Sequence, residues 1–108
     1  MKYNIFTGKD EQFYFRFTTD ANENVLKSEG YAAAASRNNG IESVKKHSEN
    51  EANYEKLVNN AGKFTFNVKA RNGQVIATSS KSFDTEADRD AAIALLVSQA
   101  KDAVEAPE

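Results

Sequence analysis

The sequence predicts an α+β fold built from a strand–strand–strand–helix unit that occurs twice, and three observations lead to this prediction. Phe13-Tyr14-Phe15-Arg16-Phe17 has a large apolar side chain at every second position, which is the period of a half-buried strand. The stretch Phe64-Thr65-Phe66-Asn67-Val68 repeats this pattern 51 residues later. A segment with helical spacing of apolar residues follows each strand region.

The duplication extends over nearly the whole chain of 108 residues. Apolar positions match apolar positions when the chain is shifted by 51 residues, or by 52 after an insertion near Lys81. The matched pairs include Tyr3 with Tyr54, Phe15 with Phe66, Val25 with Ile76, Tyr31 with Phe83, Arg37 with Arg89 and Ile41 with Ile93. We therefore expect a single domain over residues 1–108, with one repeat at about 3–47 and the other at about 54–104.

Each repeat begins with two strands and a polar turn. The first strands are expected at residues 3–7 and 54–58, and the turns at 8–11 and 59–62. The alternating strand comes next, followed by a hairpin turn and a third strand. In the second repeat this turn contains Asn72-Gly73, which predicts a tight turn because both residues tolerate positive φ. The first repeat has Ala21-Asn22 there, so we expect a looser turn or one of another type.

A helix closes each repeat. Thr85 precedes an acidic first turn and predicts a side-chain N-cap for the second helix. The apolar residues of that helix fall on one face and are Ile93, Leu96, Val97, Ala100 and Val104. The first helix is expected from about Ala33 to His47. Ala33 stands in the place of Thr85, so this helix lacks the cap and is predicted to be the weaker of the two.

Composition limits the functions that are open to the chain. Fourteen Lys and Arg against sixteen Asp and Glu give a net charge of −2, which disfavours nucleic-acid binding. No apolar run is long enough to span a membrane. The chain has no Cys and no signal-peptide core, so we expect a cytoplasmic protein.

Several motifs together resemble the YegP-like family of small bacterial and archaeal proteins of unknown function. They are Phe13-x-Phe15-Arg16-Phe17, Ser28-Glu29-Gly30-Tyr31, Asn39-Gly40-Ile41-Glu42-Ser43-Val44-Lys45-Lys46, Gly62-Lys63-Phe64-x-Phe66-Asn67 and Asn72-Gly73-Gln74-Val75-Ile76. The resemblance implies one antiparallel sheet with both helices on one face and a pseudo-twofold axis between the repeats. It implies a monomer that contains an intramolecular pseudo-dimer. The second repeat departs from the Asn-Gly-Ile motif, since it has Ala91-Ala92-Ile93 there.

No catalytic or metal-binding constellation is evident in the sequence. His47 is the single histidine and is interpreted as a solvated residue near a helix C-terminus. The acidic residues Asp84, Glu86 and Asp88 fit a helix first turn better than a metal cluster. The hydroxyls of Ser28, Ser79 and Ser80 have no activating base. We predict no cofactor and no metal site, and the sequence favours a protein that is not an enzyme.

Six residues are candidates for binding. Arg37 and Arg89 each lie one turn before the core Ile of a helix. The favoured interpretation is a stem packed on apolar surface with its head in water, and the alternative is a pair of guanidiniums marking an anion or partner site. Tyr14 and Arg16 are expected on the sheet face opposite the helices, as are Thr18 and the counterparts Thr65, Asn67 and Lys69. This face either binds a partner or is an ordinary wet face. Tyr31 and Asn39, together with Arg37, could form a site at the repeat junction.

Two functional hypotheses follow. The favoured one is a small non-catalytic binding or interaction protein whose partner is a protein or a small molecule. The alternative is a small-ligand or anion binder, conceivably an enzyme, with its site at the repeat junction. Leu95 is predicted on the helix side opposite the core, where it could support weak self-association.

Overall fold

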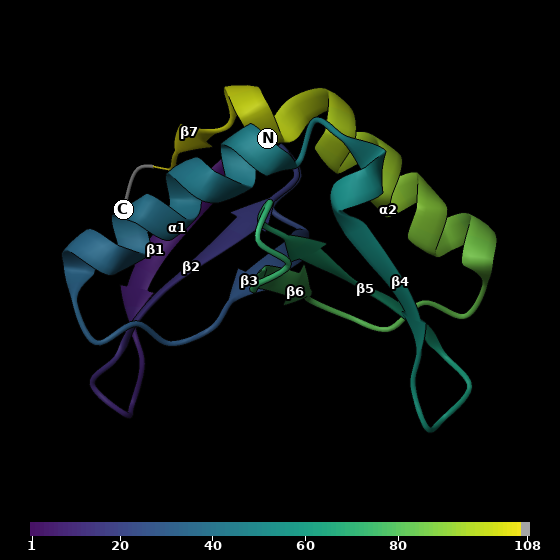
Figure 1. Ribbon diagram of the computed structural model, residues 1–108, viewed down its shortest axis with the longest axis horizontal. Helices are drawn as coiled ribbons and strands as arrows, with labels where there is room; N and C mark the ends of the chain where they lie inside the picture. Colours follow the sequence, from purple (N-terminus) through teal and green to yellow (C-terminus); the bar gives the residue numbers. More distant parts are fainter. Residues whose placement is uncertain (107–108) are drawn as a thin grey trace.

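The computed structural model describes residues 1–106 as one sheet of seven strands covered on one face by two helices (Figure 1). The elements are β1 (Lys2–Thr7), β2 (Phe13–Thr18), β3 (Asn24–Ser28), α1 (Ala34–His47), the 3₁₀ turn η1 (Glu51–Asn53), β4 (Tyr54–Val58), β5 (Phe64–Lys69), β6 (Val75–Ser79), α2 (Glu86–Gln99), the 3₁₀ turn η2 (Ala100–Asp102) and β7 (Val104–Glu105). The predicted α+β fold with a duplicated unit is confirmed.

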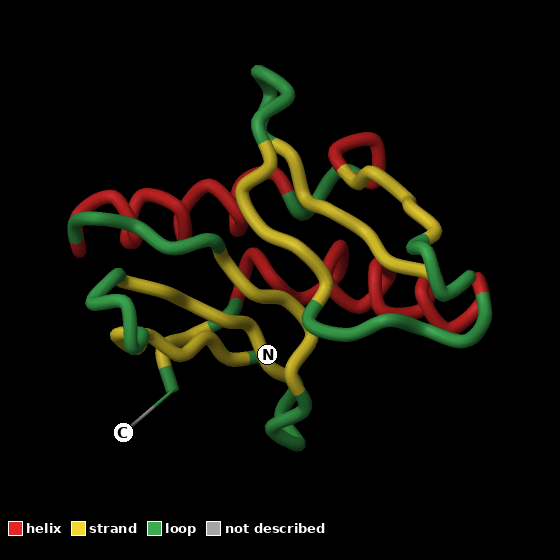
Figure 2. Tube along the Cα trace, turned by 90° about the horizontal axis from the view of Figure 1, so that it is seen from below, coloured by secondary structure: helices red, strands yellow, loops and turns green. Residues whose placement is uncertain are grey.

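The strand order is symmetric about the centre of the sheet. The order β4-β5-β6-β3-β2-β1-β7 places the third strands of the two repeats side by side, with Lys27 paired to Thr78. Seen from the side opposite the helices, the strands lie in front and both helices lie behind them (Figure 2). The helices begin at opposite outer ends of the molecule in Figure 1. This arrangement is the pseudo-twofold one that the family resemblance implied.

The core lies between the sheet and the helices. Phe15 and Phe17 of β2 are fully buried, as are Phe66 and Val68 of β5, and Leu96 of α2 packs in the same cluster. The strand alternation puts these side chains on the helix-covered face. Other members of this cluster are Leu26, Ile41, Val44, Tyr54, Ala77, Ile93, Ala100 and Ala103.

The sheet is not purely antiparallel, because its C-terminal strand runs parallel to its neighbour. Val104 pairs with Lys2 and Glu105 with Tyr3. The prediction that Val104 lies on the core face of the second helix is wrong, since α2 ends at Gln99 and Val104 is 63% exposed. The chain leaves the helix there because Ala100 and Ala103 are buried in the core and turn it toward β1.

All four hairpins have the same backbone geometry. In the first, Gly8 N–H donates to Gln12 O and Glu11 N–H donates to Gly8 O, and the other three repeat this pattern. One residue of each turn has positive φ; these residues are Glu11, Asn22, Gly62 and Gly73. Each turn is therefore a type I turn followed by a left-handed residue. Two turn predictions are therefore wrong. The turn at Asn72-Gly73 has positive φ at Gly73 and not at both residues, and the turn at Ala21-Asn22 is not looser, because Asn22 has positive φ like Gly73 and the hydrogen bonds are the same.

Two further sequence expectations change in detail. Thr18 was expected on the wet face but is 3% exposed. It pairs with Lys2 of β1 and, across a β-bulge next to Phe17, with Asn24 of β3. Ser28 and Ser79 have a structural role, since their hydroxyls accept the backbone amides of Phe15 and Phe66. These hydroxyls provide hydrogen-bond acceptors for backbone amides of β2 and β5.

The turn geometry predicts that Glu11→Gly stabilises the protein. Glu11 has φ 63°, in a region that costs a residue with a Cβ about 1–2 kcal/mol. Glycine avoids this cost but loses more entropy on folding, so we expect a net gain of about 0.5–1 kcal/mol in the free energy of unfolding, measured by urea denaturation. The neighbouring Gln12→Gly should destabilise. Equal destabilisation by both substitutions would contradict the argument.

The two helix N-termini predict a second stabilising substitution. Thr85 Oγ1 accepts the backbone N–H of Asp88 at 3.1 Å, whereas Ala33 has nearly the same backbone angles and no cap. Ala33→Thr should therefore raise the free energy of unfolding by about 1 kcal/mol, and Thr85→Ala should lower it by a similar amount. Thermal unfolding followed by circular dichroism would measure both. An unchanged midpoint for Ala33→Thr would show that the first helix gains nothing from a cap.

Candidate functional site

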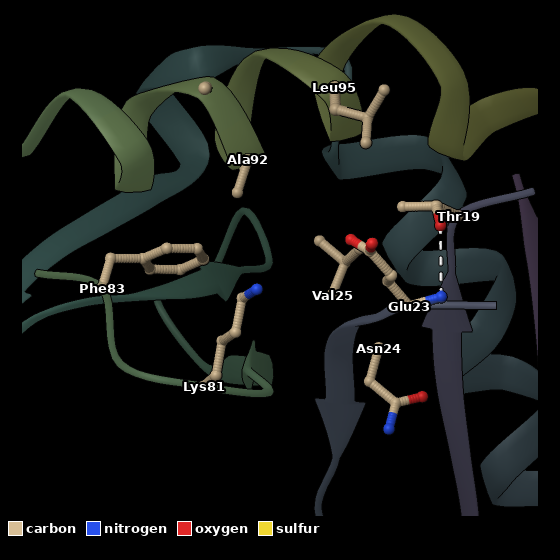
Figure 3. Close-up of a pocket in the computed structure, with 9 residues that line it drawn as sticks. Thr19, Glu23, Asn24, Val25, Lys81, Phe83, Ala92 and Leu95 are labelled. Atoms are coloured by element: carbon tan, nitrogen blue, oxygen red, sulfur yellow. Dashed lines mark hydrogen bonds between the residues drawn. The ribbon is translucent and has the colours of Figure 1, made fainter. Parts of the chain in front are cut away.

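A pocket of about 220 Å³ lies where the two repeats meet (Figure 3). The first repeat contributes its β2–β3 turn, and the second contributes the loop after β6 and one side of α2. The lining residues are Thr19, Glu23, Asn24, Val25, Lys81, Phe83, Ala91, Ala92 and Leu95. We call this the junction pocket. It forms because the β3–β6 pairing brings the first repeat's turn under the second repeat's helix.

The walls of the junction pocket are apolar. Val25 is buried at 6% exposure, Phe83 is half-buried, and Ala92 and Leu95 project from α2 toward the pocket in Figure 3. The rim carries polar groups of opposite charge from opposite repeats, Glu23 from the turn and Lys81 from the loop. The Lys81 ammonium lies 5.4 Å from the centre of the Phe83 ring. The pocket therefore suits a compact apolar group with polar atoms at its edge.

Differences in side-chain size between the repeats explain why the pocket is open on this side. At the symmetry-related position Ile76 replaces Val25, and Tyr31 replaces Phe83. A methyl group at Gly40, the counterpart of Ala92, would lie 2.5 Å from the Tyr31 hydroxyl. Tyr31 thus closes over Gly40 in the first repeat. In the second, the Ala92 methyl group and the shorter Phe83 ring prevent the same closure.

The structure corrects the prediction for Leu95. This residue is half-buried and lines the junction pocket, so it does not lie on a free outer face. Leu95 does lie on a different side of α2 from Ile93, as its helical angle predicts, but the β2–β3 turn of the first repeat covers that side (Figure 3). Weak self-association through Leu95 stays a prediction, with the junction pocket in place of a free outer face as its surface.

Tyr14 and Arg16 lie together on the sheet face opposite the helices, as predicted. The Tyr14 ring stacks on Phe6 with 5.4 Å between centroids, and the Arg16 guanidinium lies 4.9 Å from the Phe6 centroid. The Tyr14 hydroxyl donates to the Asp10 carboxylate, and this hydrogen bond raises the pKa of Tyr14 and lowers that of Asp10. Sequence reasoning missed Phe6, although its place one strand away from Tyr14 follows from the β1–β2 register.

Arg37 and Arg89 are buried at 8% and 5% exposure, so the expected solvated heads are wrong. Each guanidinium lies over the first phenylalanine of the central strand in its own repeat, at 5.5 Å from Phe13 and 5.3 Å from Phe64. Cation–π contact favours this placement. Both arginines lie in the first turns of their helices, which begin at opposite ends of the molecule (Figure 1). The structure thus supplies two separate local contacts in place of one paired site.

Tyr31, Arg37 and Asn39 do not line the pocket at the repeat junction, although Tyr31 and Arg37 both contact Phe13. Tyr31 stacks on Phe15 at 6.3 Å, and burial, with Glu29 nearby, raises the pKa of its hydroxyl. Asn39 is exposed and lines a different hollow with Tyr3, Asn38, Ile41, Glu42 and Glu105. The open pocket at the junction uses other residues. The unequal pairs Tyr31/Phe83 and Gly40/Ala92 in the repeat alignment were the signal that could have indicated it.

Residues 1–106 contain neither a metal-binding group of side chains nor a membrane-spanning helix. Within residues 1–106 no three His, Asp or Glu side chains are grouped so as to hold a metal ion. His47 Nδ1 lies 2.8 Å from the backbone oxygen of Ser43, inside the last turns of α1. Over the same residues no helix is long and apolar enough to cross a membrane.

Comparison with known proteins places both repeats in a described family. The model of a domain of unknown function, DUF1508, matches residues 9–55 and again residues 59–105. A UPF0339 protein encoded in the ptx operon 5′ region of Stutzerimonas stutzeri is 41% identical over 101 residues, which cover 94% of this chain and 90% of that protein. A UPF0339 protein of Acinetobacter baylyi is 45% identical over 91 residues, covering 84% of this chain and 81% of the relative.

Two solution NMR structures have the same fold. The YegP protein of Escherichia coli, described as a protein of unknown function, superposes with a TM-score of 0.88 at 33% identity, covering 96% of this chain and 90% of that one. A UPF0339 protein of Shewanella oneidensis gives 0.88 at 34% identity, covering 96% and 88%.

The asymmetry between the repeats predicts a coupling between Tyr31 and Gly40. Gly40→Ala should lower the free energy of unfolding in the wild-type background by about 1 kcal/mol more than in a Tyr31→Phe background, because phenylalanine lacks the oxygen that meets the new methyl group. The pair Phe83 and Ala92 shows that the fold accommodates the doubly substituted arrangement. A double-mutant cycle in urea measures the coupling. Additive effects within about 0.5 kcal/mol would contradict it.

Proposed function

The chain belongs to the DUF1508 family, the UPF0339 group that includes YegP. We propose that it is a non-catalytic binding protein whose junction pocket accepts one apolar side chain of a partner protein. The observation that carries the proposal is an apolar pocket at the repeat junction with a charged residue from each repeat at its rim.

The size of the pocket supports a side chain as the occupant. Its volume of about 220 Å³ is enough for one large side chain. An aromatic ring or a branched aliphatic group fits such a space. Protein interfaces commonly gain most of their affinity from a few such anchors in desolvated pockets.

The chemistry of the lining supports binding without catalysis. Thr19 is the hydroxyl residue of the pocket, and its oxygen already accepts the backbone amides of Ala21 and Glu23, each at 3.2 Å. A nucleophile needs a neighbouring base, and His47 does not line the pocket but lies in the last turn of α1, with its Nδ1 2.8 Å from Ser43 O. Lys81 and Glu23 can instead pair with charges that flank a partner's anchor residue, which favours orientation of the partner.

The alternative function, a small-ligand or anion binder, is favoured by a different observation. A second hollow lies on the open face of the sheet and has a polar lining that includes Lys27 and Lys81.

The proposed function is tested with selected peptides and with a variant whose own side chain fills the junction pocket. Peptides selected against the wild-type protein from a display library should share one aromatic or branched residue, and replacing that residue by alanine should weaken binding about tenfold or more. Ala91→Leu, which occupies the pocket from an exposed position of α2, should weaken the same peptides to a similar degree. Fluorescence polarisation measures both effects.

Ala87→Leu is the matched control, because Ala87 is exposed on the same helix and does not line the pocket. This variant should bind the selected peptides as the wild type does. Peptides that bind Ala91→Leu with undiminished affinity would overturn the proposal.

A further inference from the structure

The open face of the sheet carries a continuous row of polar side chains across six strands. The register pairs Asn4 with Arg16, Arg16 with Lys27, Lys27 with Thr78, Thr78 with Asn67, and Asn67 with Glu55. This face is turned toward the viewer in Figure 2. The row crosses the repeat junction between Lys27 and Thr78, so the two repeats contribute to one surface.

The charges of this row are balanced at one end only. Glu55 pairs with Lys69 at 2.8 Å and accepts a hydrogen bond from Asn67, and these contacts lower the pKa of Glu55. Arg16 and Lys27 stand on adjacent strands without an ion pair to any carboxylate among residues 1–106. Arg16 also has its Nε buried without a hydrogen-bond partner. Neighbouring cations without counter-charges make this region favourable for an anion.

A hollow of about 280 Å³ lies beside these cations. Its lining contains two ammonium groups and several hydroxyls but no carboxylate; the residues are Lys27, Thr65, Phe66, Asn67, Thr78, Ser79, Ser80, Lys81 and Ser82. We call it the open-face hollow. The Ser80 hydroxyl is buried without a partner, and the Ser82 hydroxyl accepts from Asn59 Nδ2 and so keeps its own proton free to donate. Hydrogen-bond donors on several sides are what an oxyanion requires.

The equivalent position in the first repeat is filled by larger side chains. Tyr14 and Arg16 stand where the second repeat has Thr65 and Asn67. The Tyr14 ring lies so close to Gly8 that a methyl group there would be 2.5 Å from it. The smaller side chains of Thr65 and Asn67 therefore leave room for the hollow in the second repeat.

We propose that the open-face hollow binds the phosphate group of a small phosphorylated compound. Lys27 and Lys81 would neutralise the charge, and the hydroxyls of Thr65, Thr78, Ser80 and Ser82 would donate to the phosphate oxygens. The proposal does not rest on the junction pocket, because the two sites have different lining residues except one. They share Lys81, which lines both, so the decisive variants exclude that residue.

The test is a titration with inorganic phosphate and with glucose 6-phosphate at constant ionic strength, followed by amide chemical shifts and by thermal unfolding. We expect saturable shifts at residues of the hollow and a rise in the unfolding midpoint with either compound, because a ligand that binds the folded state stabilises it. Glucose should give neither effect. Binding of glucose 6-phosphate without inorganic phosphate would overturn the assignment of the phosphate group as the recognised part.

Variants separate a built site from a general salt effect. Lys27→Gln should weaken phosphate binding at least fivefold, and Thr65→Tyr should abolish it by placing in the hollow the side chain that the first repeat already accommodates. Ser80→Ala keeps the backbone contact of Ser80 N–H with Val25 O and should weaken binding more modestly. Lys9→Gln, in an exposed turn, makes the same charge change as Lys27→Gln and should leave binding unchanged.

Equal responses of Lys9→Gln and Lys27→Gln to phosphate would overturn the proposal. The selected peptides of the junction-pocket experiment should bind Thr65→Tyr normally, so failure of one proposal leaves the other intact. Should Thr65→Tyr fail to fold, Lys27→Gln and Ser80→Ala still decide the outcome.

Discussion

The structure depends on burying the phenylalanines of β2 and β5 beneath the two helices. Neither repeat alone could cover these side chains. Phe15, Phe17 and Phe66 are fully shielded from solvent, and each would expose a large apolar area in an isolated repeat. Pairing β3 with β6 joins two three-stranded sheets into one and closes a common core. A sheet of three strands with one helix has little core of its own, so the duplication is what makes a domain of this size possible.

The two repeats share one core but differ in several side chains, and both proposed sites come from such differences. The junction pocket is open where Val25, Phe83 and Ala92 replace Ile76, Tyr31 and Gly40. The open-face hollow follows the same logic with Thr65 in the place of Tyr14. The two repeats of a duplicated fold have the same backbone. One repeat can therefore keep large side chains at a position where smaller side chains in the other leave a cavity.

Much of the candidate chemistry was visible in the sequence, but its grouping was not. The alternation of β2 correctly predicted Tyr14 and Arg16 on the open face. The repeat alignment correctly matched Arg37 and Arg89 as equivalent positions of the two helices. Their burial over Phe13 and Phe64 was not predicted, because helical spacing says which side a residue faces and not which ring lies beneath it. Leu95 was misplaced for a similar reason. A helical wheel identifies the side of α2 that faces the core. It does not show that the β2–β3 turn of the other repeat lies against a second side of the helix, the one that carries Leu95.

The sequence by itself determined the three strands and one helix of each repeat, the duplication and the buried face of β2 and β5, because these depend on short-range periodicity that any local stretch displays. Only the tertiary structure decided which residues of different repeats meet, that the C-terminal strand joins β1 in parallel, and that the turns share one left-handed residue each. Glu11 illustrates the limit, since its positive φ is imposed by the hairpin that surrounds it and contradicts its own preference. Contacts between distant segments depend on side-chain volumes at the meeting point, which a one-dimensional pattern does not contain.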